Sequence, residues 1–348
     1  AGRARISHGG AGHAGLAAAV QTQRSHADVQ ELGNCPSVIA WHFNGEGKGV
    51  NTARTYNQAT QILRELDPTR VVLCVELGWR SSGTVGSIDM DVAGMGNYTG
   101  WYEGTLEHIG PYMDDYRQRL RERYGRDVPM LLSNYGAAAE SDTHANLPRR
   151  NDYSHEYHTA FHRRFVEEMV ARPWIAGGTM FCWRDMETLQ PIEHHTWKGA
   201  LDRQEGRRDA FHFYRSQWTT EPMVHIAQHS WSPRLVWPPE QDTRFELFSN
   251  CDTVELFHND MSLGARSPQD GLTWPVRLTP GANRLYALGR QGDVRAEHQA
   301  EIEVSVTPPA LEVRLGRSGT HIDKLGLTWD AIPGVKKYIV EAEGATQG

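Results

Sequence analysis

Polar and aromatic residues stand at the ends of several short apolar segments, and their types could do sugar chemistry. These residues are Asn44, Glu46, Glu76, Asn97, Tyr98, Asn134, Tyr135, Trp183 and Asp185. Retaining hydrolysis of a glycosidic bond needs two carboxyl groups about 5–5.5 Å apart, one to protonate the leaving oxygen and one to attack the anomeric carbon. Aromatic faces, in turn, stack on the apolar faces of sugar rings. Such chemistry is possible here only if the fold gathers these segment ends on one face.

Short apolar segments alternate with amphipathic ones between residues 36 and 219. We expect strands at 37–42, 70–77, 91–98, 129–135 and 175–183, and helices at about 52–66, 105–124, 154–171 and 208–218. This alternation is typical of βα units around a parallel sheet, and in a βα barrel the catalytic side chains sit at the carboxyl ends of the strands. A closed barrel has eight units and five strands are visible, so we expect an α/β fold that is a partial (β/α)8 TIM barrel, cut from a larger parent.

The sequence pattern changes after the last predicted helix. From about residue 222, short alternating strands with Pro, Gly and Asn-Asp turns predict an all-β, immunoglobulin-like sandwich. A second break falls at Thr307-Pro308-Pro309, and the remaining residues are too few for a sandwich of ~100 residues. The closing LTWDAIPGVKKYIVEA resembles the opening strands of a fibronectin type III module. The predicted domains are therefore 1–220 (barrel part), 221–307 (sandwich) and 308–348 (the start of a fibronectin type III-like module).

Two segments resemble the catalytic motifs of glycoside hydrolase family 2. Residues 34–46, NCPSVIAWHFNGE, resemble the fourth-strand segment of the family, which reads N-H-P-S-V followed by W and G-N-E. The resemblance places Glu46 at the acid/base position. Asn44 and Gly45 are transposed relative to the family, in which the Asn before the glutamate bonds the substrate 2-hydroxyl, and Asn44 is the candidate for that role.

The second motif lacks its carboxylate. Residues 133–137, SNYGA, resemble the seventh-strand segment S-E-Y-G-A, in which the glutamate is the nucleophile. Asn134 stands at that position, carries no charge and cannot attack as a carboxylate. His144 and the run at 154–158, SHEYH, resemble the family segment downstream. The resemblance therefore implies a β-galactosidase-like retaining glycosidase that is impaired in hydrolysis.

Further segments extend the resemblance to about residues 30–340. Residues 97–102, NYTGWY, resemble N-Y-x-G-W-Y and place Tyr98 beside the nucleophile position. Residues 181–186, FCWRDM, resemble the eighth-strand W-x-x-x-D-F region and imply that Trp183 and Asp185 shape the sugar subsite. Residues 196–199, TWKG, resemble N-x-K-G, in which the Asn and Lys bind the carboxylate of uronic acids. Lys198 is therefore a substrate-binding candidate, and Thr196 in place of the Asn favours a neutral sugar such as galactose.

Several classes of partner and cofactor receive no support. The formal net charge of -7, with 23% charged residues and no basic stripe, argues against nucleic acid or an anionic membrane as a partner. No apolar run reaches the ~20 residues of a membrane span. No Gly-rich nucleotide loop follows a strand, the four cysteines are scattered, and His194-His195 lack a third ligand, so we expect no cofactor, no disulfide framework and no metal site.

Other readings of the same residues stay open. Glu76, at the end of a predicted strand, could offer a spare carboxylate. Glu140 and Asp142, in the segment after Asn134, could act as the nucleophile in its place. A carbohydrate-binding pseudoenzyme that recognises a β-linked oligosaccharide without cutting it is the alternative to a hydrolase. A homo-oligomer is one option for assembly. No signal peptide is visible, and a periplasmic or extracellular location rests on analogy with exported glycan-degrading enzymes.

Overall fold

The computed structural model describes residues 27–42, 50–75, 88–187, 195–236, 242–305, 314–317 and 325–328. The chain divides into two compact units, residues 1–210 and 211–348, and each is described by itself. Among the described helices, none has both the length and the apolar character that a bilayer crossing requires. All four cysteines are free thiols, and Cys74, Cys182 and Cys251 are buried.

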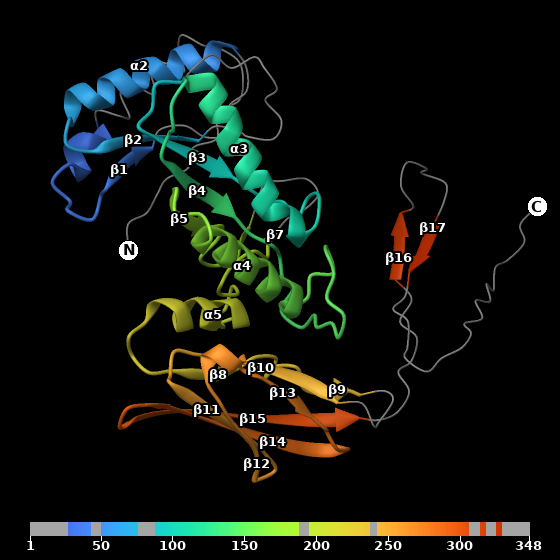
Figure 1. The fold of residues 1–348 in the computed structure, drawn as a ribbon. Coiled ribbons are helices and arrows are strands. Elements are labelled where there is room, and N and C mark those ends of the chain that lie inside the picture. Colours follow the sequence, from blue (N-terminus) through green and yellow to red (C-terminus); the bar gives the residue numbers. More distant parts are fainter. Residues whose placement is uncertain are drawn as a thin grey trace, which may run out of the picture. The chain divides into compact units, whose positions relative to one another are not determined.

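Unit 1 contains a parallel sheet whose strands follow one another in both sequence and space (Figure 1). The strands are β1 (Ala40–His42), β2 (Val71–Val75), β3 (Val92–Gly96), β4 (Met130–Tyr135) and β5 (Ile175–Met180). The helices are α2 (Val50–Leu66), the 3-10 turn η1 (Leu106–His108), α3 (Ile109–Tyr124) and α4 (His155–Val170), with α5 (Asp209–Trp218) beginning at the end of the unit. The predicted half-barrel of five βα units is confirmed, with element bounds within a few residues of those expected.

The middle strands of the sheet carry fully buried apolar side chains. Val72 of β2, Met95 of β3, and Met130 and Leu132 of β4 are fully buried, whereas β5 is partly or fully exposed over most of its length. Helix α4 contributes a ladder of aromatic rings, in which Phe165 stacks on Tyr135 of β4 with ring centroids 4.7 Å apart. This packing fixes the strand that ends in the Asn134 segment.

Local signals set the ends of the helices. The Ser154 hydroxyl accepts a hydrogen bond from the Tyr157 amide at 3.1 Å and caps the start of α4. Gly125 ends α3 in the left-handed conformation, with φ of 63°, and its amide donates to the Arg121 carbonyl. Helices α3 and α4 lie side by side, and Arg172 joins them by an ion pair to Asp114 at 2.7 Å.

Strand β1, which leads toward the Glu46 segment, is tied to the start of β2. The Trp41 indole donates to the Asp67 carboxylate at 2.9 Å, and Arg70 pairs with the same carboxylate at 2.6 Å. Hydrogen bonds from Thr69, Arg70 and Trp41 hold the pKa of Asp67 well below its usual range. The carboxylate is therefore ionised at neutral pH and fixes β1 to the loop after α2.

Unit 2 is built from two main sheets. One has the order β13 (Thr273–Val276), β10 (Thr243–Ser249), β8 (Val224–Ile226), and the other has the order β12 (Met261–Arg266), β11 (Thr253–His258), β14 (Gly281–Gln291), β15 (Val294–Ser305), β9 (Arg234–Leu235). Neighbouring strands are antiparallel apart from β9 and β15. A single apolar cluster takes side chains from both sheets, including Ile226, Phe245, Leu256 and Ile302. The predicted antiparallel β fold after the half-barrel is confirmed.

Short ladders complete the described structure. In unit 1, β6 (Met186–Glu187) pairs with β7 (His195–Thr196). In the predicted third module, β16 (Arg314–Arg317) pairs with β17 (Leu325–Thr328). The domain limits expected from the sequence, at 220 and 307, remain predictions, because the division into compact units falls at residue 210.

Candidate active site at the strand ends

Asn134 lies at the end of β4 and is held by its neighbours. Its side-chain oxygen accepts a hydrogen bond from the Ser133 hydroxyl at 3.0 Å, and its amide nitrogen donates to the Tyr98 hydroxyl at 3.3 Å. Gly96 of β3 faces it so closely that an added Cβ would lie 2.6 Å from the Asn134 side-chain oxygen. The structure thus brings together two residues that the sequence placed in the site, Asn134 and Tyr98.

Tyr98 is oriented by the turn that follows β3. The buried Asn97 side chain accepts a hydrogen bond from the Thr99 amide at 2.9 Å, which closes a tight turn around Tyr98. Gly100, with φ of 88°, continues the turn, and its carbonyl accepts a hydrogen bond from the Tyr157 hydroxyl of α4. The tyrosine next to Asn134 is therefore positioned by backbone geometry and by α4.

Lys198 is buried beside two aromatic rings. It is 3% exposed, and its Nζ lies 5.3 Å from the ring centroid of Tyr102 and 5.9 Å from that of Trp101. Such distances give favourable cation–π contacts. The sequence motif pointed to Lys198, whereas the role of the two rings became visible only in the fold.

A glycine allows the Lys198 segment to reach β4. A Cβ at Gly136 would lie 2.1 Å from the Phe181 carbonyl oxygen and 3.6 Å from the Lys198 Cβ. The Cys182 amide also donates to the Lys198 carbonyl at 3.1 Å, so the segments after β5 and before α5 run together. The glycine of the SNYGA segment is thus required by the close approach of the Phe181 carbonyl, while the Lys198 side chain lies at ordinary contact distance.

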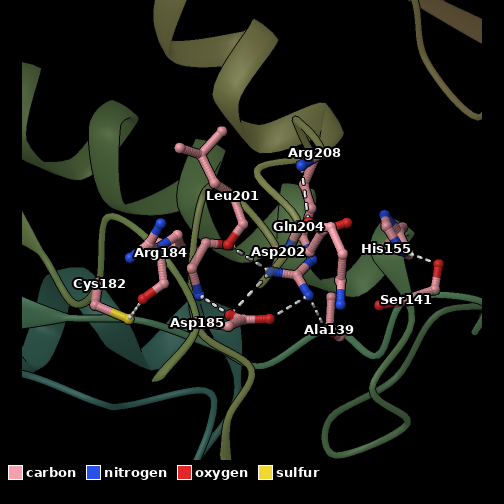
Figure 2. A network of polar contacts seen from close by, with 12 residues as sticks. Ala139, Ser141, His155, Cys182, Arg184, Asp185, Leu201, Asp202, Gln204 and Arg208 are labelled. Atoms are coloured by element: carbon pink, nitrogen blue, oxygen red, sulfur yellow. Dashed lines mark hydrogen bonds and ion pairs between the residues drawn. The ribbon is translucent and has the colours of Figure 1, made fainter. Parts of the chain in front are cut away.

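Asp185 forms the centre of a buried polar network with Arg208 (Figure 2). The two side chains are each about 2% exposed and are joined by two contacts, of 2.7 and 3.0 Å. Asp185 also accepts a hydrogen bond from the Gly199 amide at 2.8 Å. Arg208 donates further to the carbonyls of Gly199 and Ala139, both at 2.8 Å.

This network ties the loop after β4 to the Lys198-Gly199 segment. An ion pair removed from water is stabilised when its remaining donors and acceptors are also bonded, and here backbone groups of Gly199 and Ala139 supply most of those bonds, while the buried Arg208 Nε has no hydrogen-bond partner among the described residues. Asp185, expected from the sequence to contact substrate, has its carboxylate engaged by Arg208 and Gly199. Arg208 was not among the predicted site residues, because the sequence does not show that its side chain is buried.

Trp183 and Cys182 lie next to each other but differ in exposure. The Trp183 side chain is 64% exposed, which leaves indole surface open to stacking on a ring. Burial raises the pKa of the Cys182 thiol to about 12, so this sulfur stays protonated and is a poor nucleophile at neutral pH.

A histidine–carboxylate group holds the loop after β4. His144 Nδ1 lies 2.8 Å from the Glu156 carboxylate, and His155 stacks on His144 with centroids 4.9 Å apart. Burial lowers the pKa of His155, so its ring is neutral at physiological pH. Glu140 and Asp142, the spare carboxylates of this loop, are exposed. Glu46, Asn44, Glu76 and His194 lie outside the described residues, and their predicted roles stay predictions.

Comparison with known proteins supports the family expected from the motifs. Residues 10–220, more than half of the chain, match the model described as "Glycosyl hydrolases family 2, TIM barrel domain". Residues 240–296 match a domain of unknown function, DUF4982.

Individual relatives carry glycosidase names. A Formosa agariphila protein named "Putative beta-glucuronidase" is 27% identical over 299 residues, which cover 74% of this chain and 35% of that protein. A beta-galactosidase of Bacteroides ovatus is 31% identical over 121 residues, which cover 34% of this chain and 13% of that protein.

The fold is also similar to solved structures. An FMN-binding beta-glucuronidase from Facaelibacterium prausnitzii L2-6 superposes with a TM-score of 0.73 and 25% identity, over 84% of this chain and 45% of that one. The chain thus spans about a third to a half of the length of these two glucuronidases. The half-barrel and the order of the motifs agree with the family model, which matches most of unit 1. The chain therefore belongs to glycoside hydrolase family 2.

Proposed function

We propose that this chain is the catalytic half-barrel of a retaining β-glycosidase in which Glu46 is the acid/base and Asn134 occupies the nucleophile position. The observation that carries the proposal is the placement of Asn134. It sits at a rigid strand end, within hydrogen-bond distance of Tyr98 and facing Gly96. A nucleophile needs such a fixed position, which the exposed Glu140 and Asp142 of the following loop do not offer.

The amide changes the chemistry of the position. A carboxylate there would accept a hydrogen bond from the Tyr98 hydroxyl and attack the anomeric carbon, whereas the Asn134 amide donates to that hydroxyl. No covalent glycosyl intermediate can then form in the usual way, because the amide is a weak nucleophile. Loss of a catalytic nucleophile lowers turnover by roughly 10³-fold or more, so the chain as written is a severely impaired hydrolase.

The substrate we propose is a β-glucuronide. The buried Lys198 cation supports a sugar that carries a carboxylate, and several relatives carry the name beta-glucuronidase. The Thr196 substitution points instead to a neutral sugar such as a galactoside, and a beta-galactosidase is also among the relatives. Lys198 is the cation of the TWKG segment at residues 196–199, and a contact between its charge and a carboxylate is stronger than a contact from a neutral amide. The charge of Lys198 therefore outweighs the loss of one amide contact at position 196.

Restoring the carboxylate tests the proposal. The full-length protein and its Asn134→Glu variant are assayed with aryl β-glucuronide and aryl β-galactoside. We expect Asn134→Glu to raise turnover by on the order of 10³-fold or more, with the glucuronide preferred. Asn134→Gln is the matched control, since it restores the side-chain length without the charge and should stay inactive.

Small anions give a second arm of the same test. Azide or formate fills the space of a missing carboxylate, and we expect either anion to raise the turnover of the unmodified protein. If Asn134→Glu cleaves neither glycoside and the anions restore nothing, the hydrolase proposal is wrong.

A second candidate function is binding without cleavage. The uncharged Asn134 together with the exposed Trp183 ring supports a pseudoenzyme that holds a β-linked oligosaccharide. Calorimetric titration separates the two: tight binding to the Asn134→Glu variant without product formation would favour the binding protein, and product formation by this variant would exclude it.

A further inference from the structure

Three histidines from distant parts of the sequence converge in unit 2. His225 belongs to β8, His229 to the turn after it, and His298 to β15. One ring nitrogen from each residue lies within 4.8 Å of those of the other two. The ring centroids are 4.7 Å apart for His225 and His298, 4.9 Å for His225 and His229, and 5.2 Å for His229 and His298. We propose that these three imidazoles bind a divalent transition-metal ion.

The fold brings the three side chains together by two routes. Strands β8 and β15 belong to different sheets but lie in contact with each other, and this contact brings His225 and His298 together. Gln228, with φ of 64°, takes the left-handed conformation in the turn at residues 227–230 after β8, and this turn brings His229 close to the other two histidines. The separation along the chain explains why no metal motif was predicted from the sequence.

The central ring of the group is held in place. His225 is 2% exposed, and the ring of His212 from α5 lies parallel to it with centroids 3.6 Å apart and an angle of 4° between the ring planes. His229 and His298 are only partly buried. One ligand is therefore fixed, while two have room to adjust and a water has access to a remaining coordination position.

The chemistry selects the class of ion. Neutral imidazole nitrogen suits zinc, cobalt, nickel and copper, whereas magnesium and calcium prefer oxygen ligands. In a tetrahedral zinc site with Zn–N bonds of about 2.0–2.1 Å, ligand nitrogens lie about 3.3 Å apart. The nitrogens therefore have to close by roughly 1.5 Å at most, which small rotations of the His229 and His298 side chains supply.

One hydrogen bond must change when the ion binds. The Ile226 amide donates to His298 Nδ1 at 3.2 Å, so this nitrogen acts as an acceptor. A neutral imidazole has one lone pair and one N–H, and a ligand that binds through Nε2 carries its proton on Nδ1. Coordination of His298 therefore breaks the contact with the Ile226 amide or replaces it, which gives the site its own spectroscopic signature.

The bound ion would join the two sheets of unit 2. A metal that binds the folded state and not the unfolded one raises the apparent stability by mass action. Because its ligands come from β8 and β15, the ion acts as a cross-link between the sheets. This role does not depend on the glycosidase proposal, since all three ligands belong to unit 2.

The test uses the tag-free full chain and measures binding without any activity assay. Zinc is titrated by calorimetry, and the cobalt(II) absorption spectrum is recorded. We expect one zinc ion per chain, a raised melting temperature, a cobalt spectrum typical of four-coordinate nitrogen ligands, and a shift of the Ile226 amide resonance.

Variants separate this site from the other histidines of the chain. His229→Gln and His298→Gln, at partly buried positions, should each weaken zinc binding by more than about tenfold and remove the thermal shift. His108→Gln, at an exposed position of η1, is the control and should bind zinc as the parent does. The variant that combines His229→Gln with His298→Gln should not bind zinc. If this double variant still binds zinc, or if the folded parent does not bind it, the proposal is wrong.

Discussion

The end of β4 and the Asp185–Arg208 network differ in the charged groups that they contain. At the strand end, Asn134 occupies the proposed nucleophile position without a charge, and its amide donates to Tyr98. In the network, Arg208 and Asp185 form an ion pair that is about 2% exposed and bonded to the backbone of Gly199 and Ala139. In the proposed assignment, one region lacks its reacting group, while the other keeps its ion pair and its bonds to the backbone.

Under this assignment, the shape of the site is stabilised separately from its chemistry. The Arg208 pair connects the loop after β4 with the Lys198 segment, so folding of unit 1 depends on it whether or not a carboxylate reacts nearby. Asn134 makes few contacts by comparison, and a change there costs little stability. The predictions below test this contrast, from the largest expected effect to the smallest.

Arg208→Met should cause the largest loss of stability. It leaves the Asp185 carboxylate buried without its partner, and breaking a buried ion pair costs about 3–5 kcal/mol. Urea denaturation of the full chain measures the free energy of unfolding. Arg203→Met removes a comparable pair, Arg203 with Glu187 at 2.8 Å, at the surface, and should cost no more than about 1 kcal/mol. Equal losses in the two variants would contradict the assigned role of Arg208.

Gly136→Ala should be the next most harmful change. The added Cβ meets the Phe181 carbonyl oxygen at 2.1 Å, so the segments after β4 and β5 have to move apart. Overpacking of this kind costs about 1–3 kcal/mol. Thermal denaturation checks it, and an unchanged melting temperature would show that the strand ends are less tightly packed than described.

His162 should make stability depend on pH. Burial in α4 lowers its pKa to about 3 in the folded state, from the ordinary value of 6.5. Because the unfolded chain binds the extra proton between these values, stability is fully present above about pH 6.5 and falls as the pH drops toward 3, by up to ~1.4 kcal/mol per pH unit for this group.

His162→Phe keeps a ring in the same packing and removes the proton. Its loss of unfolding free energy between pH 7.5 and 5.5 should be smaller than that of the parent by about 1 kcal/mol. An identical pH dependence in both proteins would mean that His162 does not stay neutral on folding.

Tyr98→Phe should have the smallest effect on stability. It removes one hydrogen bond of 3.3 Å to Asn134, and such a bond contributes about 1 kcal/mol or less. In the Asn134→Glu background, however, the same change should lower turnover, because the carboxylate then loses a donor. Equal turnover with and without the Tyr98 hydroxyl in that background would separate this residue from the chemistry.

The secondary-structure elements of unit 1 could be predicted from the sequence. Apolar runs and helical spacing located all five strands and the helices after them, because these patterns reflect which face of each element is buried. The order of the motifs indicated the family, and the resemblance of residues 133–137 to the seventh-strand segment of that family predicts that Asn134 replaces the nucleophile carboxylate. His144 and the run at 154–158 came from the same resemblance, and His144 contacts Glu156 of that run at 2.8 Å.

The contacts between buried polar side chains could not be predicted from sequence patterns. Asp185 is predicted to shape the sugar subsite, and only the fold shows that its carboxylate binds Arg208, 23 residues further along the chain. The convergence of His225, His229 and His298 depends on how two sheets pack. The sequence by itself therefore determined the elements, the family and the identity of residue 134, because these are local properties. Only the tertiary structure decided which charges pair and which imidazoles meet, because burial and long-range contact arise when distant segments pack together.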